Sequence, residues 1–237
     1  MKKFVIEDSV LEILPEIQVG TILCKGVNNR YQDNEAEYLR MIRDAEKKAV
    51  DYLKLPNFSD NPVIQVWRDA FQKFKTKKGA RCSIEALMKR IEKDNPVGTI
   101  NPLVDIYNAV SLTFALPAGG EDVAKIQGDV RLAKAVGDEP FLVLGSEESS
   151  SPYPEEIVYK DDAGALCRCL NWREAVRTML TEDTTSAFLC MESVDPARNG
   201  DLRAALDDLK DQLERRLGAA CVIQIADRAH PVLEWDD

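Results

Sequence analysis

The spacing of apolar residues changes near the middle of the chain, and this change limits the folds that the sequence can adopt. In the first half, apolar residues recur every three or four positions, as they do along one face of a helix. In the second half, they form short runs separated by turn residues, as strands do. Helices followed by a block of short strands favour an α+β fold over a doubly wound one. Helices are predicted over 35–53, 62–74, 83–91, 102–115 and 201–217, and strands over 4–6, 19–27, 129–133, 139–144, 156–159, 165–170, 186–191 and 219–225.

The length of 237 residues fits one sizeable hydrophobic core. A single domain spanning 1–237 is therefore expected, with a strand-and-helix N-terminal part (1–95) and a core sheet with the C-terminal helix (96–237). Asp161-Asp162-Ala163-Gly164 predicts a tight hairpin turn between two of the strands.

The net charge of −10 argues against a protein that binds nucleic acid through its overall charge. One segment is locally basic, and it is either a set of solvated helix faces or a local contact surface. Its basic residues are Arg68, Lys73, Lys75, Lys77, Lys78, Arg81, Lys89, Arg90 and Lys93.

Several classes of protein are disfavoured by what the sequence lacks. No apolar run reaches the length of a membrane span, and the first residues do not form a signal peptide, so we expect a cytoplasmic protein. The six cysteines are expected to be buried free thiols. His230 is the only histidine, which argues against a Ser-His-Asp or Cys-His device and against a metal site. No glycine-rich nucleotide-binding loop is present, so no cofactor is expected.

Polar residues gather between residues 101 and 192, where we expect the functional site. Asn171-Trp172-Arg173 follows an apolar strand, so it either lines a pocket or forms a turn in which Arg173 pairs with Glu174 or Asp183. Gly119-Gly120 either lets a ligand approach the backbone or forms a turn. The 181–185 segment, Thr-Glu-Asp-Thr-Thr, predicts a capped turn.

Three of these segments, in this order along the chain, resemble the B3/B4 domain, the tRNA-editing domain of the phenylalanyl-tRNA synthetase beta subunit. They are 101–110, 116–122 and 181–185. The Asn-Trp-Arg triplet and the layout of the chain are similar to those of free-standing bacterial relatives, and the resemblance covers about residues 80–194. It implies an α+β, B3/B4-like domain with a mixed or antiparallel sheet core, flanking helices and an N-terminal helical extension.

The resemblance also implies a function. In the synthetase, this domain hydrolyses tRNA that carries the wrong amino acid, so the chain is expected to be an aminoacyl-tRNA deacylase that works in trans. The alternative is a non-catalytic module that binds an amino acid or a tRNA end. The implied partners are the aminoacylated 3′ end of tRNA and its amino-acid moiety, with no membrane, and a homo-oligomer remains open.

The matching positions give the expected site residues. Glu121 and Asn171 are expected to be catalytic. Those expected to bind substrate are Asn108, Gly119, Gly120, Arg173, Arg177 and Thr178. Gly119 stands near the place of a histidine in the synthetase domain, and the stretch from Asn171 to Arg177 replaces a Gly-Gly-Glu segment. The pocket is therefore expected to have lost that histidine and glutamate and to have gained an arginine for a carboxylate or phosphate.

Overall fold

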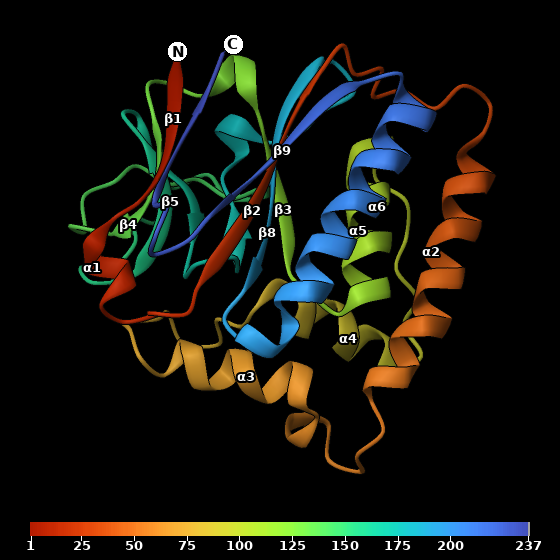
Figure 1. The fold of residues 1–237 in the computed structure, drawn as a ribbon, viewed down its shortest axis with the longest axis horizontal. Helices are drawn as coiled ribbons and strands as arrows, with labels where there is room; N and C mark the ends of the chain where they lie inside the picture. Colours follow the sequence, from red (N-terminus) through yellow and green to blue (C-terminus); the bar gives the residue numbers. More distant parts are fainter. Residues whose placement is uncertain (237) are drawn as a thin grey trace.

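Two β-sheets and a layer of helices form the fold of this chain, in a computed structural model that describes residues 1–236 (Figure 1). The sheets pack against each other, and helices cover the far face of one of them. The helices are α1 (Asp8–Leu11), α2 (Glu35–Ala49), α3 (Pro62–Phe71), α4 (Ser83–Glu92), α5 (Pro102–Phe114) and α6 (Asn199–Leu217).

The first sheet has the strand order β10-β1-β4-β5-β6-β7. Its β1 and β4 are parallel, whereas its other neighbours are antiparallel, so the sheet is mixed. Its strands are β1 (Lys2–Ile6), β4 (Val130–Lys134), β5 (Ile157–Asp161), β6 (Gly164–Arg168), β7 (Arg173–Glu174) and β10 (Val232–Trp235).

The second sheet is antiparallel, with the order β3-β8-β2-β9. Its strands are β3 (Ala118–Asp122), β8 (Ser186–Ser193), β2 (Gln18–Lys25) and β9 (Ala220–Ala226). Because β1 and β2 are inner strands of the two sheets, the first 25 residues are built into both.

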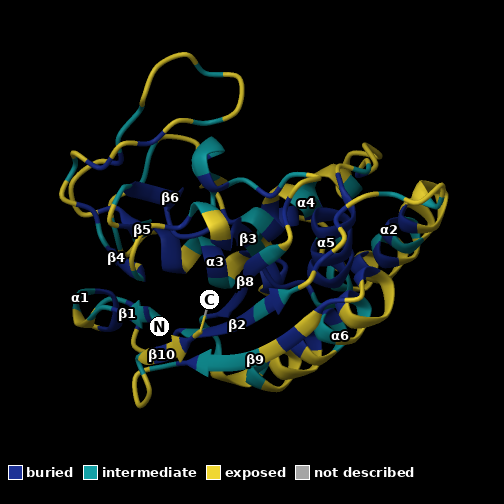
Figure 2. Ribbon diagram, turned by 90° about the horizontal axis from the view of Figure 1, so that it is seen from above, coloured by how far each residue is buried: buried dark blue, intermediate teal, exposed yellow. Residues whose placement is uncertain are grey.

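Side chains of β8 alternate between two cores, as the twofold period of a strand requires. Phe188 and Cys190 face the first sheet, whereas Leu189 and Met191 face helices α5 and α6. Figure 2 shows the result: β2, β8 and helix α5 are largely buried, whereas the edge strand β9 is partly exposed and α2 and α6 expose their outer sides. The space between the two sheets is where the candidate site lies.

Helix α5 is buried along almost its whole length and links the sheets to the helical layer. Its start follows the sequence prediction: the Asn101 side chain accepts a hydrogen bond from the backbone N–H of Val104, and Pro102 holds the first helical position. It ends at Ala115, which is left-handed with φ 49°. The polypeptide then runs directly into β3.

The α+β fold and its mixed sheet are confirmed, and the predicted helices are present with small shifts at their ends. Helix α2 ends at Ala49, and a 3-10 turn over Val50–Tyr52 follows it. The hairpin turn at 161–164 joins β5 and β6 as predicted. The cysteines within the described residues are free and buried, also as predicted.

One local prediction is wrong. Residues 139–144 do not form a strand, because Pro140 lacks an N–H and the Phe141 N–H is bonded to the Ser149 side chain. Of the two interpretations of Gly119-Gly120, the turn is not found, because both glycines lie in β3. No helix in the described part of the chain is both long enough and apolar enough to cross a membrane.

Candidate functional site

A cavity of about 280 Å³ opens between the two sheets, beside helices α4 and α5. Strands β3 and β8 form one wall, and β6 with the segment that follows it forms the other. The structure brings together six of the eight residues expected from the sequence. These are Asn108, Gly119, Gly120, Glu121, Asn171 and Arg173.

The other two expected residues lie outside this lining. Arg177 makes a forked ion pair with Asp161, with N–O distances of 2.6 and 3.0 Å, and donates to the carbonyl of Lys125. It therefore fixes the β5–β6 turn. Thr178 is fully buried, and its side chain lies beside the carboxyl group of Glu121, whose pKa, raised by burial, it partly lowers.

Among the described residues, three glutamates line the cavity: Glu121, Glu174 and Glu192. Glu192 of β8 is fully buried. It accepts hydrogen bonds from the Tyr159 hydroxyl at 2.7 Å and from the Asn171 side-chain amide at 3.3 Å. Burial raises the pKa of Glu192 to about 7, although both hydrogen bonds oppose the shift.

Glu174 of β7 lies half-buried against strand β3. Its Oε1 accepts a hydrogen bond of 3.1 Å from the backbone N–H of Gly120. Gly119 permits this approach, because a Cβ at that position would lie 2.8 Å from the same oxygen. Desolvation raises the pKa of Glu174 to about 7, so its proton is readily exchanged near neutral pH.

Glu121 of β3 is buried, and its Oε2 has no hydrogen-bond partner within the described residues. Burial raises the pKa of Glu121 well above its ordinary value, and the negative charge of Glu174 raises it further. Two neighbouring carboxyl groups of this kind do not both ionise readily. Such a pair titrates as a unit, so one of the two carboxyl groups holds a proton over a pH range in which the other exchanges one.

Asn171 positions other groups. Its amide donates to Glu192, and its Oδ1 accepts from the backbone N–H of Ser83, at the start of α4, at 3.4 Å. The chain reaches Asn171 through Cys169 and Leu170, which are both left-handed, with φ values of 47° and 64°. This sharp bend turns the segment from β6 back toward the cavity.

Arg173 is exposed at the mouth of the cavity. Its guanidinium lies 5.1 Å from the ring centre of Trp172. Within residues 1–236 it makes no ion pair: Glu174 is bonded to Gly120, and Asp183 pairs with Arg30. The structure thus does not contain the ion-paired turn that was the alternative interpretation of this triplet.

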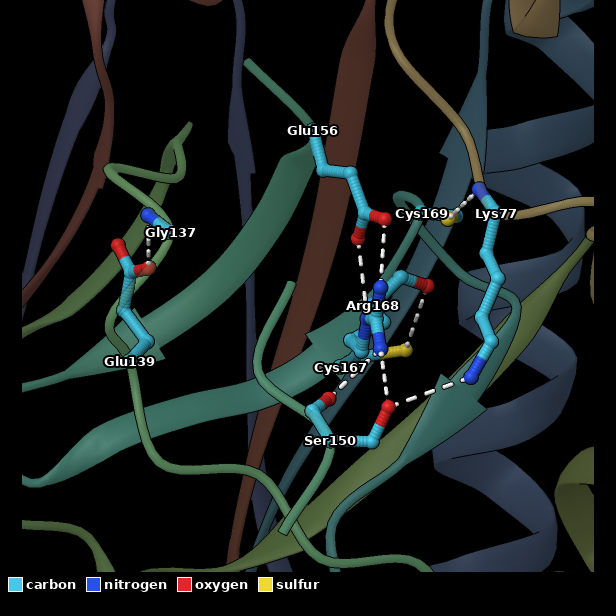
Figure 3. A network of polar contacts seen from close by, with 8 residues as sticks. All are labelled: Lys77, Gly137, Glu139, Ser150, Glu156, Cys167, Arg168 and Cys169. Carbon is cyan, nitrogen blue, oxygen red and sulfur yellow. Dashed lines mark hydrogen bonds and ion pairs between the residues drawn. The ribbon is translucent and has the colours of Figure 1, made fainter. Parts of the chain in front are cut away.

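A buried ion pair supports the bend after β6 (Figure 3). Arg168 makes two hydrogen bonds to Glu156, of 2.6 and 3.0 Å, and its guanidinium also donates to the carbonyl of Ser150 at 2.6 Å. The Lys77 ammonium group donates a hydrogen bond of 3.2 Å to the Ser150 hydroxyl, and the Lys77 backbone N–H donates one to the Cys169 thiol. The network joins three segments directly behind the cavity.

The sequence led us to expect that the stretch from Asn171 to Arg177 would leave the cavity without a glutamate. The cavity is instead acidic. Glu174 lies in that segment and lines the cavity. The sequence offered a signal for Glu192, because it continues the alternation of Phe188 and Cys190 on one face of β8, but the predicted strand stopped at residue 191. No local pattern marked Glu174, since β7 has only two residues.

No group of three or more His, Cys, Asp or Glu side chains within residues 1–236 is arranged to hold a metal ion. The cavity offers carboxyl groups with raised pKa values, side-chain amide groups and the exposed backbone of small residues.

Comparison with known proteins agrees with the resemblance seen in the sequence. The phenylalanine–tRNA ligase beta subunit of Shewanella oneidensis is 34% identical over 70 residues, which are 30% of this chain and 9% of that protein. The chain thus spans a small part of the length of this curated relative. A crystal structure of an N-terminal fragment of the phenylalanyl-tRNA synthetase beta subunit from Pyrococcus horikoshii matches with a TM-score of 0.47 and 15% identity, covering 92% of this chain and 49% of that one. The B3/4 domain family matches residues 66–234, well over half of the sequence, and the chain belongs to this family.

Proposed function

We propose that this chain binds the aminoacyl ester at the 3′ end of a tRNA and hydrolyses that ester in trans. The observation that carries the proposal is the composition of the cavity. Among the described residues, three glutamates line its interior and two arginines lie at its mouth. Membership of the B3/4 domain family and the match to a phenylalanine–tRNA ligase beta subunit support a tRNA-related substrate.

The charges of the cavity favour an aminoacyl ester over a free amino acid. Both ligands carry an α-ammonium group, which carboxylates attract. Only the free amino acid also carries an α-carboxylate, which carboxylates repel. Of the described residues that line the cavity, the basic ones are Arg90 and Arg173. Arg90 is exposed and bonded to the carbonyl of Pro96, and Arg173 is exposed above Trp172. Neither arginine is placed to neutralise the α-carboxylate of a free amino acid bound inside the cavity.

The two neighbouring glutamates on the β3 side supply acid and base chemistry. Glu174, with a pKa of about 7, accepts a proton from a water molecule that attacks the ester carbonyl carbon. Glu121, whose pKa is raised well above its ordinary value by burial, donates a proton to the ribose oxygen as the ester C–O bond breaks. The products are a free amino acid and a deacylated tRNA. Asn171 acts by positioning Glu192 and the start of α4, not by contact with the reacting atoms.

The tRNA contacts the basic groups around the mouth. Arg173 has a guanidinium free of ion pairs within the described residues, which can fork onto a phosphate. Helix α4 lines the cavity and places Arg90 at its mouth. These local charges allow binding to RNA despite the net charge of −10.

Incubation of the purified chain with a panel of aminoacylated and misacylated tRNAs tests the proposal. We expect ester loss above the buffer rate for at least one aminoacyl group, and much slower loss when the same amino acid is N-acetylated. No loss for any member of the panel contradicts the proposal. Thermal stabilisation by one aminoacyl ester analogue without hydrolysis would instead assign a non-catalytic binding module.

A further inference from the structure

Two thiols lie in contact on the face of the second sheet that is turned away from the cavity. Cys24 of β2 is directly opposite Cys221 of β9 in the antiparallel register. Their sulfur atoms are 2.9 Å apart. Both side chains belong to the core between this sheet and helix α6, whereas the cavity lies on the other side of β8. The pair is therefore separate from the proposed substrate site.

Both thiols are buried, but Cys221 is the less deeply buried of the two. Strand β9 is an edge strand, and Cys221 lines a shallow surface cavity together with Glu214 and Val222. Cys221 is 7% exposed, whereas Cys24 is 0% exposed. A small reagent that approaches this edge reaches Cys221 first and finds Cys24 directly behind it.

We propose that Cys24 and Cys221 are a redox-active dithiol that reacts with low-molecular-weight disulfides and closes to a cross-strand disulfide. The Cys221 thiolate attacks one sulfur of the reagent, which forms a mixed disulfide and releases one thiol. The Cys24 thiol then loses its proton and attacks the Cys221 sulfur, which expels the second thiol. Two protein thiols are oxidised to one disulfide, and one reagent disulfide is reduced to two thiols.

The environment of the pair supports this order of attack. The hydrogen bond between the two thiols lowers the pKa of Cys221 and raises the pKa of Cys24. Cys167 and Cys190 provide a comparison, because they line the substrate cavity. Burial and nearby glutamates raise both of their pKa values well above the ordinary one, so these thiols stay protonated and unreactive.

The pair does not fit a structural metal site. Zinc sites of proteins use four ligands, or three with an open position. No third His, Cys, Asp or Glu joins Cys24 and Cys221 in such an arrangement within the described part of the chain. Redox chemistry is the use that two isolated, touching thiols support.

Peptide mapping of the full chain after treatment with oxidised glutathione tests the proposal. The remaining thiols are alkylated before digestion, and the masses of the cysteine peptides are measured. We expect a cross-linked pair of peptides that contains Cys24 and Cys221, reversed by dithiothreitol, with Cys167 and Cys190 alkylated as free thiols. Free Cys24 and Cys221 after this treatment, or glutathione found first on Cys167 or Cys190, would overturn the proposal.

Serine variants test the order of attack. Cys24→Ser should stop at a glutathione mixed disulfide on Cys221, and Cys221→Ser should leave Cys24 unmodified because it is buried. Cys190→Ser is the matched control and should form the cross-link as the unchanged chain does. A mixed disulfide on Cys24 in the Cys221→Ser variant contradicts the assigned order. If a serine variant does not fold, the map of the unchanged chain decides alone.

Discussion

Burial is what gives individual residues of the cavity their chemistry. Glutamate is normally ionised at neutral pH, but desolvation brings the pKa values of both Glu174 and Glu192 to about 7. Sequence reasoning found Glu121 and Asn171 through the family motifs. It could not find Glu174, because the desolvation of that side chain depends on Gly119 and Gly120 of a strand far away in sequence.

Glu192 makes the stability of the chain depend on pH. Its pKa is raised on folding, so its contribution is present below a pH of about 4.5 and is lost as the pH rises through about 7. The free energy of unfolding should therefore fall between pH 5 and pH 8, with roughly 2–3 kcal/mol of the decrease due to this residue. In urea titrations at pH 5 and pH 8, Glu192→Gln should reduce the difference between the two free energies of unfolding by this amount. The exposed Glu234→Gln is the control, and an undiminished pH dependence in Glu192→Gln would contradict the assignment.

The proposed role of Arg173 depends on a single guanidinium group that makes no ion pair within residues 1–236. Arg173→Ala should weaken the binding of an aminoacyl-tRNA by roughly 1–3 kcal/mol, as expected for a lost charge-assisted contact, and should leave the melting temperature nearly unchanged. Filter binding and thermal unfolding measure the two quantities. Loss of the fold would show that the Arg173–Trp172 contact is structural.

Strand β3 shows why some elements could be predicted and others could not. Long helices such as α5 can be predicted because their apolar residues repeat at helical spacing over several turns. Asn101 and Pro102 also mark where α5 begins. Strand β3 consists of Ala-Gly-Gly-Glu-Asp, which has no apolar alternation, and its pairing with β8 is set by packing alone. The opposite happened at 139–144, where an apolar run suggested a strand but Pro140 and the bond between the Phe141 N–H and Ser149 prevent it.

The two glycines of β3 face opposite sides and provide a matched pair of tests. Gly119→Ala places a Cβ 2.8 Å from Glu174 Oε1, the end of a flexible side chain, so the carboxylate must move while the fold is kept. Deacylation should fall roughly 10- to 100-fold.

Gly120→Ala instead places a Cβ 2.3 Å from Leu189 Cδ2 in a packed core, and should destabilise the chain by roughly 1–3 kcal/mol. Deacylation rates and urea unfolding of both variants check the pair. Equal losses of stability in Gly119→Ala and Gly120→Ala would contradict the claim that Gly119 faces the cavity and Gly120 faces the packed core.

At the scale of the whole molecule, distant segments are held together behind the cavity. Glu156→Gln leaves the buried Arg168 without its counter-charge, and should cost roughly 3–5 kcal/mol in urea unfolding. The neighbouring Glu155→Gln, which removes an exposed pair with Lys134, should cost less than about 1 kcal/mol. Similar costs for the two variants would show that the network does not support the fold.

The whole molecule also combines an overall negative charge with a basic mouth on one cavity. Composition alone disfavoured a nucleic-acid partner, whereas the structure places Arg90 of α4 and Arg173 beside the cavity, where the proposed tRNA contact needs them. The family motifs supplied the fold and the location of the site. Its acidity follows from the way that β3, β7 and β8 meet in space.

The most direct test of the central claim is the rate of ester hydrolysis by the unchanged chain and by Glu174→Gln, with the most susceptible aminoacyl-tRNA of the panel. The proposed role as general base predicts a loss of about 100-fold or more, with binding and melting temperature maintained, whereas the exposed Glu182→Gln should hydrolyse as the unchanged chain does. Equal hydrolysis by Glu174→Gln and the unchanged chain would contradict the account.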